Sequence, residues 1–326
     1  MLNDKNILIT GGTGSFGMKC TKIILDRYKP KRLIIFSRDE LKQFEMAQDY
    51  SDTKYDSIRY FIGDVRDKER LHRAFHNVDY VIHAAALKQV PAAEYNPFEA
   101  VKTNILGAQN VINVAIDQGV KKVIALSTDK AANPINLYGA TKLCSDKLFI
   151  AGNSYVGHKH TIFSVVRYGN VVGSRGSVIP FFLKCRENGV LPITDPRMTR
   201  FWITLEQGVD FVLNCLETMV GGELFVPKLP SMNIMDLAKV IAPECKTNII
   251  GIRPGEKLHE VMIPKDDARR TIEYDDHYVI QPDFVFWEKR FIDSGCKPAP
   301  AEFEYNSGDN PWMLTPEQMS EIIKNL

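Results

Sequence analysis

The chain has 326 residues, with 41 lysines and arginines against 40 acidic side chains and a formal net charge of +1. This length suits one large domain or two smaller ones that share a site, and the even charge balance does not favour nucleic acid as a partner. No apolar run approaches the roughly 18 residues that cross a membrane, and MLNDKNILIT leads into a predicted strand without a signal peptide. Six widely spaced cysteines without a C-x-x-C pair predict reduced thiols in a cytoplasmic protein with no metal framework.

Short apolar runs in the first half of the chain are rich in Ile and Val and do not alternate with polar residues, as strands buried on both faces should read. Helical patterns separate these runs, so the sequence predicts an α/β fold built on a Rossmann-type, doubly wound parallel sheet. The predicted strands are residues 6–10, 32–36, 58–63, 79–85, 122–126 and 161–167.

A glycine-rich turn follows the first predicted strand and opens the first predicted helix. In ILITGGTGSFG the glycines satisfy G-x-G-x-x-G in the strand–turn–helix context that makes this motif specific. Glycines let the backbone approach a pyrophosphate, which binds at the helix N-terminus. We therefore predict a dinucleotide cofactor that contacts Gly11, Thr13, Gly14, Ser15, Phe16 and Gly17.

The end of the second predicted strand, Phe36-Ser37-Arg38-Asp39, indicates which dinucleotide binds. An NAD enzyme usually carries an acid here for the ribose 2′-OH, whereas Ser37 and Arg38 can donate to a 2′-phosphate. Asp39 follows slightly late and could cap the next helix instead. The sequence therefore predicts NADP.

The turns after the third and fourth predicted strands should complete the cofactor site. Asp64 in GDVRD is placed to reach the adenine edge, and it could also cap the helix that begins near Lys68. Lys88, after HAAAL, should lie at the edge of the sheet where ligands of such folds bind. The cofactor contacts predicted from these turns are Asp64, Val65, Ala84 and Ala85.

The stretch ALSTDKAANPINLYGATK combines two catalytic patterns. Tyr138 and Lys142 have the Y-x-x-x-K spacing, which places them on one face of a helix. The Lys142 ammonium can lower the pKa of the tyrosine and hold the cofactor ribose, and a tyrosinate can take a proton from a substrate hydroxyl. Asp129 and Lys130 add an acid and an amine; the alternative is that STDK is only a polar strand end with a helix cap.

The regular alternation of strands and helices ends near residue 168. Loops, proline-marked edges and two amphipathic helices follow, so the C-terminal part is expected to be a smaller lobe for the substrate. We predict an NADP-binding Rossmann domain at 1–168, to which the chain returns near 204–228, and a substrate-binding lobe at 169–326.

These motifs resemble those of extended short-chain dehydrogenases/reductases that act on nucleotide sugars, over essentially the whole chain. The resemblance is carried by GGTGSFG, GDVRD, HAAALKQVP, STDK, YGATK, RYGNVVGSRGSVIP, DPRMTRFWI and RPGEKLHE. Within that superfamily the chain is most similar to the inverting UDP-N-acetylglucosamine 4,6-dehydratases (5-epimerising), because retaining dehydratases carry Thr-Asp-Glu where this chain has Lys130. The resemblance implies NADP, UDP-N-acetylglucosamine as substrate, a homo-oligomer between a dimer and a hexamer, and the opening step of pseudaminic acid biosynthesis.

A dehydratase of this kind needs the extra acid and amine. Once C4 is a ketone, Lys130 would take the C5 proton and Asp129 would protonate the departing C6 hydroxide; hydride would return to C6, and a proton would return to the opposite face of C5. By resemblance, Thr128 binds the C4 oxygen. Lys142 and the oxidised nicotinamide should lower the pKa of Lys130 while Asp129 should raise it, so the sequence leaves its charge state open.

The substrate itself is expected to contact several turns. Arg200 and Arg253 suit a diphosphate because a guanidinium matches phosphate oxygens in a fork, although surface ion pairs are the alternative for each. Glu256 suits a ribose diol, Asn170 the diphosphate or sugar, and TDPRMTRFWI the uracil or ribose. The predicted substrate contacts are Lys88, Asn170, Thr194, Met198, Arg200, Arg253 and Glu256.

Other functions remain compatible with these motifs. A UDP-N-acetylglucosamine 4-epimerase and a retaining 4,6-dehydratase share the fold, and Asp129 with Lys130 argues against both. An NADP-sensing regulator would be a non-enzymatic alternative, but such proteins usually lose the Tyr/Lys pair that this chain retains.

Overall fold

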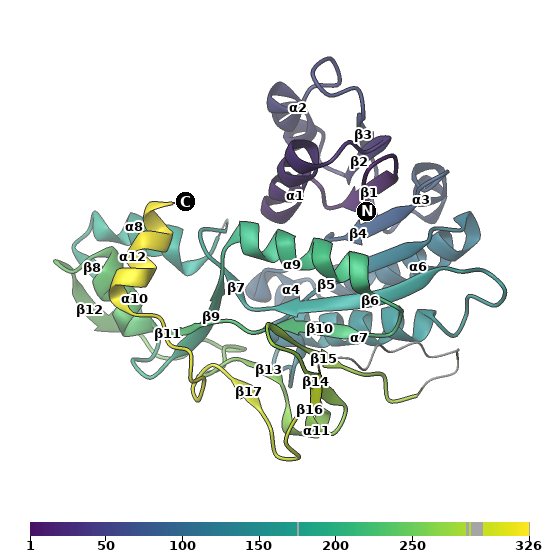
Figure 1. Ribbon diagram of the computed structural model, residues 1–326. Coiled ribbons are helices and arrows are strands. Elements are labelled where there is room, and N and C mark those ends of the chain that lie inside the picture. The colour runs from purple at the N-terminus through teal and green to yellow at the C-terminus, as the bar shows by residue number, and fades with distance from the viewer. Residues whose placement is uncertain (175, 285–286, 288–295, 326) are drawn as a thin grey trace.

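The computed structural model describes residues 1–174, 176–284, 287 and 296–325. Its centre is a ten-stranded sheet in which neighbouring strands run parallel from β10 to β3 (Figure 1). The predicted α/β class is therefore confirmed, and each apolar run of the first half forms a strand. In sheet order these are β10 (Leu224–Pro227), β6 (Ile162–Tyr168), β5 (Lys122–Thr128), β4 (Tyr80–His83), β1 (Asn6–Thr10), β2 (Arg32–Ser37) and β3 (Ile58–Ile62).

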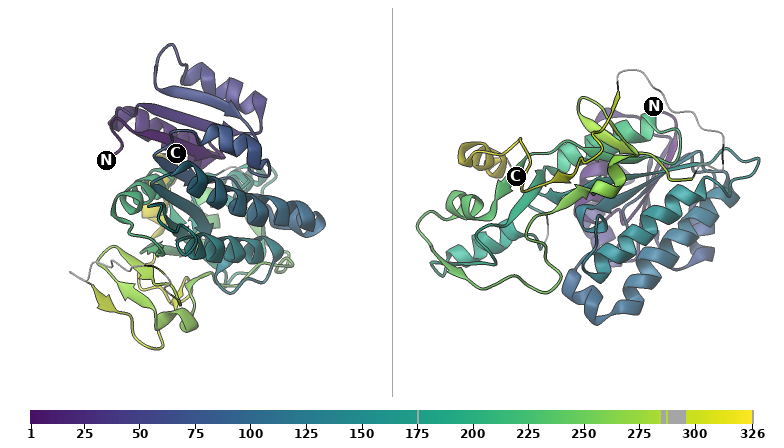
Figure 2. Two further views of the ribbon diagram at one scale, coloured as in Figure 1. Left: turned by 90° about the vertical axis from the view of Figure 1, so that its right-hand side faces the viewer. Right: turned by 90° about the horizontal axis from the view of Figure 1, so that it is seen from below.

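Helices cover both faces of this sheet, as a doubly wound fold requires (Figure 2). On one face α1 (Ser15–Arg27) packs against α9 (Leu205–Thr218), and α2 (Glu40–Asp49) follows β2. On the other, α6 (Gly107–Gln118) packs between α3 (Lys68–Ala74) and α7 (Leu137–Gly152). Strands buried between helices explain the continuous apolar runs: Ile7, Leu8 and Ile9 are fully buried.

A smaller lobe lies to the left in Figure 1 and includes the C-terminal helix. It has its own hydrophobic core. Its centre includes Phe182, Met198, Trp202, Leu237 and Met319, all at most 3% exposed. The elements around it are β7 (Asn170–Val171), α8 (Val178–Arg186), β8 (Val190–Ile193), β9 (Thr199–Ile203), β11 (Ser231–Asn233), α10 (Ile234–Ile241), β12 (Lys246–Ile249) and α12 (Pro316–Lys324).

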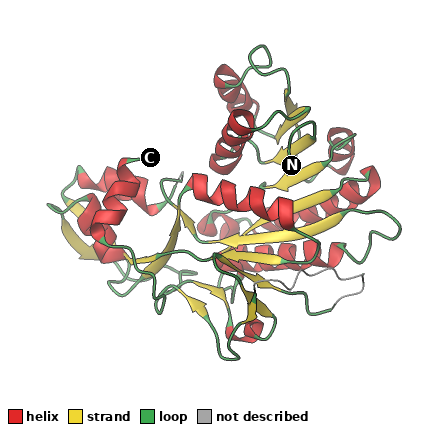
Figure 3. Cartoon of the chain, in the orientation of Figure 1, coloured by secondary structure: helices red, strands yellow, loops and turns green. Residues whose placement is uncertain are grey.

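Three short strands from the last part of the chain extend the large sheet beyond β10, and the sequence did not predict them. β15 (His277–Ile280) pairs antiparallel with β10, followed by β14 (Thr271–Glu273) and β16 (Lys297–Pro298). Strands of two to four residues are too short to show a periodic pattern. Figure 3 shows this edge as a group of small strands beside the main layer.

The six cysteines are free thiols, as the sequence predicts. Burial raises the pKa of Cys20 and Cys215, so both thiols stay protonated at neutral pH. Within the part of the chain that the structure describes, no helix is long and apolar enough to span a bilayer.

Candidate active site

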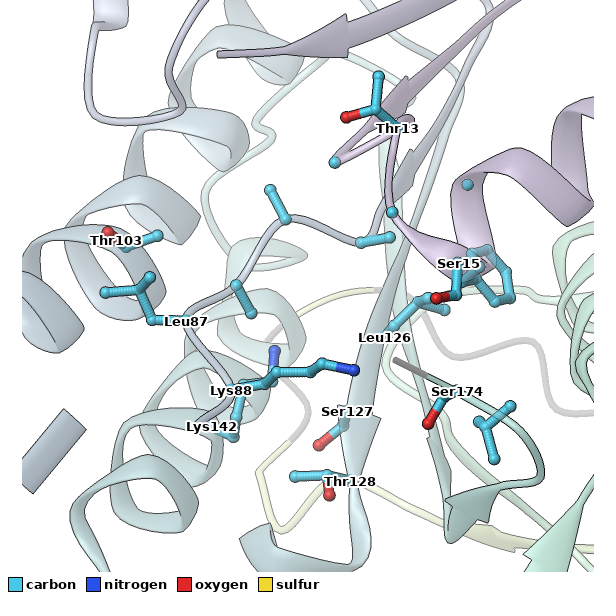
Figure 4. A pocket seen from close by; sticks show the side chains of 18 of the residues that line it. Thr13, Ser15, Leu87, Lys88, Thr103, Leu126, Ser127, Thr128, Lys142 and Ser174 are labelled. Carbon is cyan, nitrogen blue, oxygen red and sulfur yellow. The ribbon is translucent and has the colours of Figure 1, made fainter. Parts of the chain in front are cut away.

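A cavity of about 570 Å³ follows the C-terminal edge of the parallel sheet. Its lining contains every side chain predicted to bind the cofactor or to act in catalysis, together with Lys88 and Asn170. Figure 4 shows Thr13 and Ser15 from the glycine turn, Lys88 and Lys142, and Ser127 and Thr128 from the end of β5, all around this space. The structure therefore brings together residues from turns that are distant in sequence.

The glycine turn packs too closely against neighbouring backbone to accept side chains at Gly11 and Gly17. A Cβ on Gly11, whose φ is +66°, would lie 2.9 Å from the Ala85 backbone, and one on Gly17 would lie 2.4 Å from the Gly12 carbonyl oxygen. Gly14 begins α1 without a side-chain cap. The first amides of α1 therefore face the cavity with the positive end of the helix dipole, an arrangement that fits a pyrophosphate.

Polar and charged side chains line the cavity at the end of β2. The Ser37 hydroxyl lies 2.7 Å from that of Thr13, and Lys42, which the sequence analysis did not single out, lines the cavity beside Arg38. The Asp39 carboxylate accepts a hydrogen bond from the Lys42 amide at 3.0 Å and caps α2, which confirms the capping alternative. Its other oxygen lies 2.6 Å from the Lys42 ammonium.

Asp64 lines the cavity, but the alternative that it caps the following helix is wrong. Asp67 is the cap of α3, since its carboxylate accepts from the Arg70 amide at 2.9 Å. Arg66 instead donates to Asp64 from its guanidinium at 2.7 and 3.0 Å. Burial alone would raise the pKa of Asp64, but the Arg66 hydrogen bonds outweigh burial and hold that pKa below its usual value.

The catalytic helix α7 begins close against the turn that carries Asp129 and Lys130. The Asn136 side chain caps it by accepting from the Gly139 amide at 2.7 Å. Tyr138 and Lys142 share the face directed into the cavity and are 9% and 3% exposed. Gly139 permits this contact, because a Cβ there would lie 2.1 Å from the Lys130 carbonyl oxygen.

Burial controls the acidity of the Tyr/Lys pair. Burial raises the pKa of Tyr138 to about 12. The sequence had suggested Lys142 as the group that lowers this pKa, but the largest opposing effects come from Lys130 and Thr128. Burial lowers the pKa of Lys142, and Asp146, one turn further along α7, opposes this shift. Tyr138 is therefore a neutral phenol at neutral pH in this structure.

Asp129 and Lys130 form an ion pair at the end of β5, in the short 3₁₀ turn η2 (Asp129–Ala131). The Asp129 Oδ1 atom accepts from Lys130 Nζ at 3.0 Å and from the Thr128 hydroxyl at 2.9 Å. Burial raises the pKa of Asp129, but Lys130 outweighs it and the net shift is downward. Burial likewise lowers the pKa of Lys130, but its carboxylate neighbours outweigh burial and raise it. Arg200 is the main cation that opposes this rise, rather than the expected Lys142.

Glu260 is a second carboxylate beside Lys130, and the sequence analysis missed it. It is 2% exposed, and its Oε1 lies 3.4 Å from Lys130 Nζ. The same oxygen lies 3.8 Å from the Nε of Arg200. The motif RPGEKLHE ends on Glu260, but no spacing rule connects residues 130 and 260, so the sequence carries no signal for this contact.

Buried polar residues behind the cavity hold the catalytic elements in place. Asp146 accepts from the Ser127 hydroxyl at 2.6 Å and from the Arg167 guanidinium at 3.3 Å. The Asn104 side chain, from the π-helical turn η1 (Lys102–Leu106), accepts from the Leu87 amide at 2.9 Å and donates to the Leu87 carbonyl and to the Thr141 hydroxyl, both at 3.0 Å. These contacts fix the strand end, α7 and the turn before Lys88 relative to one another.

The remaining candidates for the substrate lie outside the lining of this cavity. The Thr194 hydroxyl donates to the Met198 sulfur at 3.2 Å, and Met198 is buried in the smaller core. The Arg200 guanidinium donates to the carbonyl oxygens of Leu258 and Lys257 at 3.1 and 3.0 Å. Arg253 remains 53% exposed and lies 3.8 Å from Glu256. The predicted site residues therefore fall into two groups. The candidates for cofactor binding and catalysis line the cavity with Lys88 and Asn170, and the other substrate candidates lie in or near the smaller lobe.

We expect Gly139→Ala to impair both folding and turnover. The added methyl group must displace η2 or α7, which should cost about 1–3 kcal/mol of stability, and a displacement of about 1 Å at a catalytic group can cost about a hundredfold in rate. Gly208→Ala is the matched control, because its Cβ would meet no atom closer than 3.7 Å in α9. Thermal unfolding and steady-state kinetics of both variants test this, and equal behaviour would contradict the close packing described here.

A parallel sheet that carries this glycine turn and this Tyr/Lys pair is the arrangement of the short-chain dehydrogenases/reductases, and the chain is of that class. It belongs to the polysaccharide biosynthesis protein family, whose model matches residues 7–282. It is 58% identical to a UDP-N-acetylglucosamine 4,6-dehydratase (inverting) of Campylobacter jejuni, over 100% of this chain and 99% of that protein. It is 41% identical to a UDP-glucose 4-epimerase of Rickettsia felis, over 100% and 97%. The crystal structure of Pen from Bacillus thuringiensis aligns with a TM-score of 0.91 and 39% identity, over 100% of this chain and 98% of that one.

Proposed function

We propose that this chain is a UDP-N-acetylglucosamine 4,6-dehydratase that inverts C5. The observation that carries the proposal is the Asp129–Lys130 pair, which lines the same cavity as Tyr138 and Lys142. The full-length similarity to an enzyme of that name supports the choice of reaction and substrate. A 4-epimerase needs only the Tyr138 step, and an acid–amine pair at the cavity would then have no task.

The residues that line the cavity suit distinct roles in this reaction. Tyr138 would bind the C4 hydroxyl and take its proton, Thr128 would hold the same oxygen, as the resemblance implies, and Lys142 would bind the ribose of the cofactor. NADP would supply the hydride chemistry between C4 and C6. Tyr138 must lose its proton from a neutral phenol, so turnover by this step should rise with pH below its pKa of about 12.

The Asp129–Lys130 pair contains the one proton that the elimination needs. Transfer of a proton from the Lys130 ammonium to Asp129, over 3.0 Å, leaves a neutral amine and a carboxylic acid. The amine then takes the C5 proton, and the acid protonates the hydroxide that leaves C6 as the C5–C6 double bond forms. No proton has to enter or leave the pair before the reaction, so its resting ionic state and its reactive state differ only in the position of one proton.

We further propose NADP as the cofactor. Ser37, Arg38 and Lys42 line the cavity at the end of β2, and the nearby Asp39 is engaged as the α2 cap and as the partner of the Lys42 ammonium at 2.6 Å. The exposed Arg38 guanidinium, 3.7 Å from Asp64, is available to a phosphate. A 2′-phosphate would thus meet positive charge and hydroxyl donors at this turn.

The double variant Ser37→Asp with Arg38→Leu should move the preference towards NAD. It removes two donors and adds a negative charge that repels a 2′-phosphate while accepting from a ribose 2′-OH. Binding of NADP and of NAD is measured separately by calorimetry, with Arg32→Leu, an exposed residue at the other end of β2, as the control. A native protein that copurifies with NAD, identified by mass spectrometry, would contradict the assignment.

For the nucleotide we propose contacts from the smaller lobe. Arg253 is the better candidate for the diphosphate, because its guanidinium is exposed whereas that of Arg200 is occupied by backbone carbonyls. Glu256 has a buried oxygen without a hydrogen-bond partner among the residues described, which suits a ribose hydroxyl. The Met198 sulfur accepts from both the Thr194 hydroxyl and the Arg200 guanidinium, and we propose that this group forms the wall for the uracil or ribose.

We also propose a cytoplasmic homo-oligomer that opens pseudaminic acid biosynthesis, as the resemblance implies. Tyr95 and Phe98, on α4 (Val90–Tyr95) and α5 (Pro97–Val101), are 87% and 76% exposed. Large apolar side chains on adjacent short helices are typical of protein–protein contacts. Light scattering of the purified chain measures the oligomeric state, and a monomer at micromolar concentration would contradict this part of the proposal.

Incubation with UDP-N-acetylglucosamine and NADP, followed by proton NMR of the product, tests the reaction. A dehydratase gives a C6 methyl doublet, whereas a 4-epimerase gives an axial C4 hydroxyl with C6 unchanged. An unaltered sugar that nevertheless changes the binding of NADP would favour the regulator instead.

A further inference from the structure

The segment before β13 (Val261–Ile263) is attached to the catalytic turn at several points. Its residues contact the backbone just after η2, the Asn136 cap of α7 and the Lys130 ammonium. The contacts are Lys257 Nζ to the Ala132 carbonyl oxygen, Asn136 Nδ2 to the Gly255 carbonyl oxygen at 2.8 Å, and Glu260 Oε1 to Lys130 Nζ at 3.4 Å. One short stretch therefore fixes the backbone and a side chain of the turn on which the proposed chemistry depends.

Glu260 is held rigidly in this stretch. The Glu260 amide donates to the Ser307 hydroxyl at 2.9 Å, and the Ser307 amide donates to the Glu260 carbonyl oxygen at 2.8 Å. The Ser307 hydroxyl is in turn 2.8 Å from that of Thr199, next to Arg200 in β9. The carboxylate is thus placed beside Lys130 by a hydrogen-bonded framework rather than by a flexible loop.

A buried carboxylate at this position needs an explanation. Glu260 is 2% exposed, and its Oε2 accepts no hydrogen bond from the residues that the structure describes. The Oδ2 of Asp129 is likewise buried and without a partner in the described chain. A buried carboxylate oxygen without a hydrogen bond destabilises the folded protein, so such oxygens usually bind a ligand or take part in proton transfer. Both oxygens belong to the two carboxylates that flank the Lys130 ammonium.

We propose that Glu260 is a positioning residue for Lys130 in the proton transfers at C5, acting as the second carboxylate that orients its ammonium. The inference rests on the proposed dehydratase reaction. While Asp129 exchanges a proton with Lys130 and with the leaving C6 oxygen, Glu260 keeps its contact and holds the nitrogen in place. Arg200, whose Nε lies 3.8 Å from the Glu260 Oε1, places a second cation beside this carboxylate.

The charge of Glu260 should also influence the proton that Lys130 shares with Asp129. The charged and titratable groups around Lys130 are Asp129 in η2, Glu260 before β13, Arg200 in β9, Lys257 and the Tyr138 phenol of α7. Burial lowers the pKa of Lys130, and the two carboxylates outweigh burial. Removal of the Glu260 charge therefore lowers this pKa and leaves Asp129 as the only carboxylate that orients the ammonium.

The test compares Glu260→Gln, Glu260→Asp and the exposed control Glu302→Gln. Two rates are followed with UDP-N-acetylglucosamine: C4 oxidation by the absorbance of the reduced nicotinamide, and C5 exchange by NMR in heavy water. For Glu260→Gln we expect substrate affinity and C4 oxidation close to those of the unmodified chain and C5 exchange slower by about tenfold or more, as for other residues that orient a reacting group. Glu260→Asp should restore part of the C5 exchange, because it keeps a carboxylate beside Lys130.

Equal losses in C4 oxidation and C5 exchange, without rescue by Glu260→Asp, would assign Glu260 a structural role and overturn the inference. An unchanged C5 rate in Glu260→Gln would do the same. Failure of the proposed function would look different, since the unmodified chain itself would then exchange no C5 hydrogen.

Discussion

Tyr138→Phe should reduce turnover by about two orders of magnitude or more, as expected for loss of a general base. That factor corresponds to about 2.7 kcal/mol in the barrier. In the proposed reaction the missing hydroxyl is the one that takes the proton of the C4 hydroxyl. The phenyl ring still fills the same buried space, so the proposed cofactor NADP and the substrate should bind nearly as before. Both the elimination and the C5 exchange depend on prior C4 oxidation, so the rates of all three steps should fall together.

The measurement is steady-state turnover together with calorimetric binding of NADP and of the substrate. Tyr155→Phe is the control, because that side chain is 71% exposed and lies outside the cavity lining. Turnover within error of the unmodified chain would remove Tyr138 from the mechanism, and a loss explained entirely by weaker binding would give it a structural role.

Lys130→Glu should abolish inversion at C5 together with most of the activity. The change restores the Thr-Asp-Glu triplet of retaining dehydratases, but it places a third carboxylate beside Asp129 and Glu260. Like charges in a buried site raise each other's pKa values, and the lost ion pair should cost about 3–5 kcal/mol of stability. Any residual product should keep the original C5 configuration.

Lys130→Gln is the companion variant, since it removes the amine without adding a charge and should fold more readily. It should still oxidise C4, so the reduced nicotinamide should accumulate while no C6 methyl group forms. Unimpaired formation of the inverted product by either variant would exclude Lys130 as the base.

The sequence predicted those parts of the site that follow strand ends. The glycine turn, Ser37 with Arg38, Lys88, the Thr128–Lys130 triplet and Tyr138 with Lys142 all line one cavity, because parallel strands present their C-terminal ends at one edge. Continuous apolar runs also located each strand between residues 6 and 168. These features are local in sequence, or follow from the topology of the sheet.

Contacts between distant segments could not be predicted in the same way. Glu260 reaches Lys130 across 130 positions, and Asn104 joins two other elements through a π-helical turn that has no sequence signature. Asp64 and Asp67 both precede α3, and only the backbone geometry decides that Asp67 is the cap. Arg200 resembles an exposed phosphate ligand in sequence, yet the fold directs its guanidinium to backbone carbonyls.

The central claim is that Asp129 and Lys130 perform an elimination with inversion. The most direct test is the reaction of UDP-N-acetylglucosamine in heavy water, followed by NMR at early times. The account predicts deuterium at C5, the hydrogen of C4 transferred to C6, and ring couplings that show an inverted C5 in the 4-keto product or its hydrate. Deuterium at C5 with the original configuration would contradict inversion, and a C5 that keeps its hydrogen would contradict the elimination and favour a 4-epimerase.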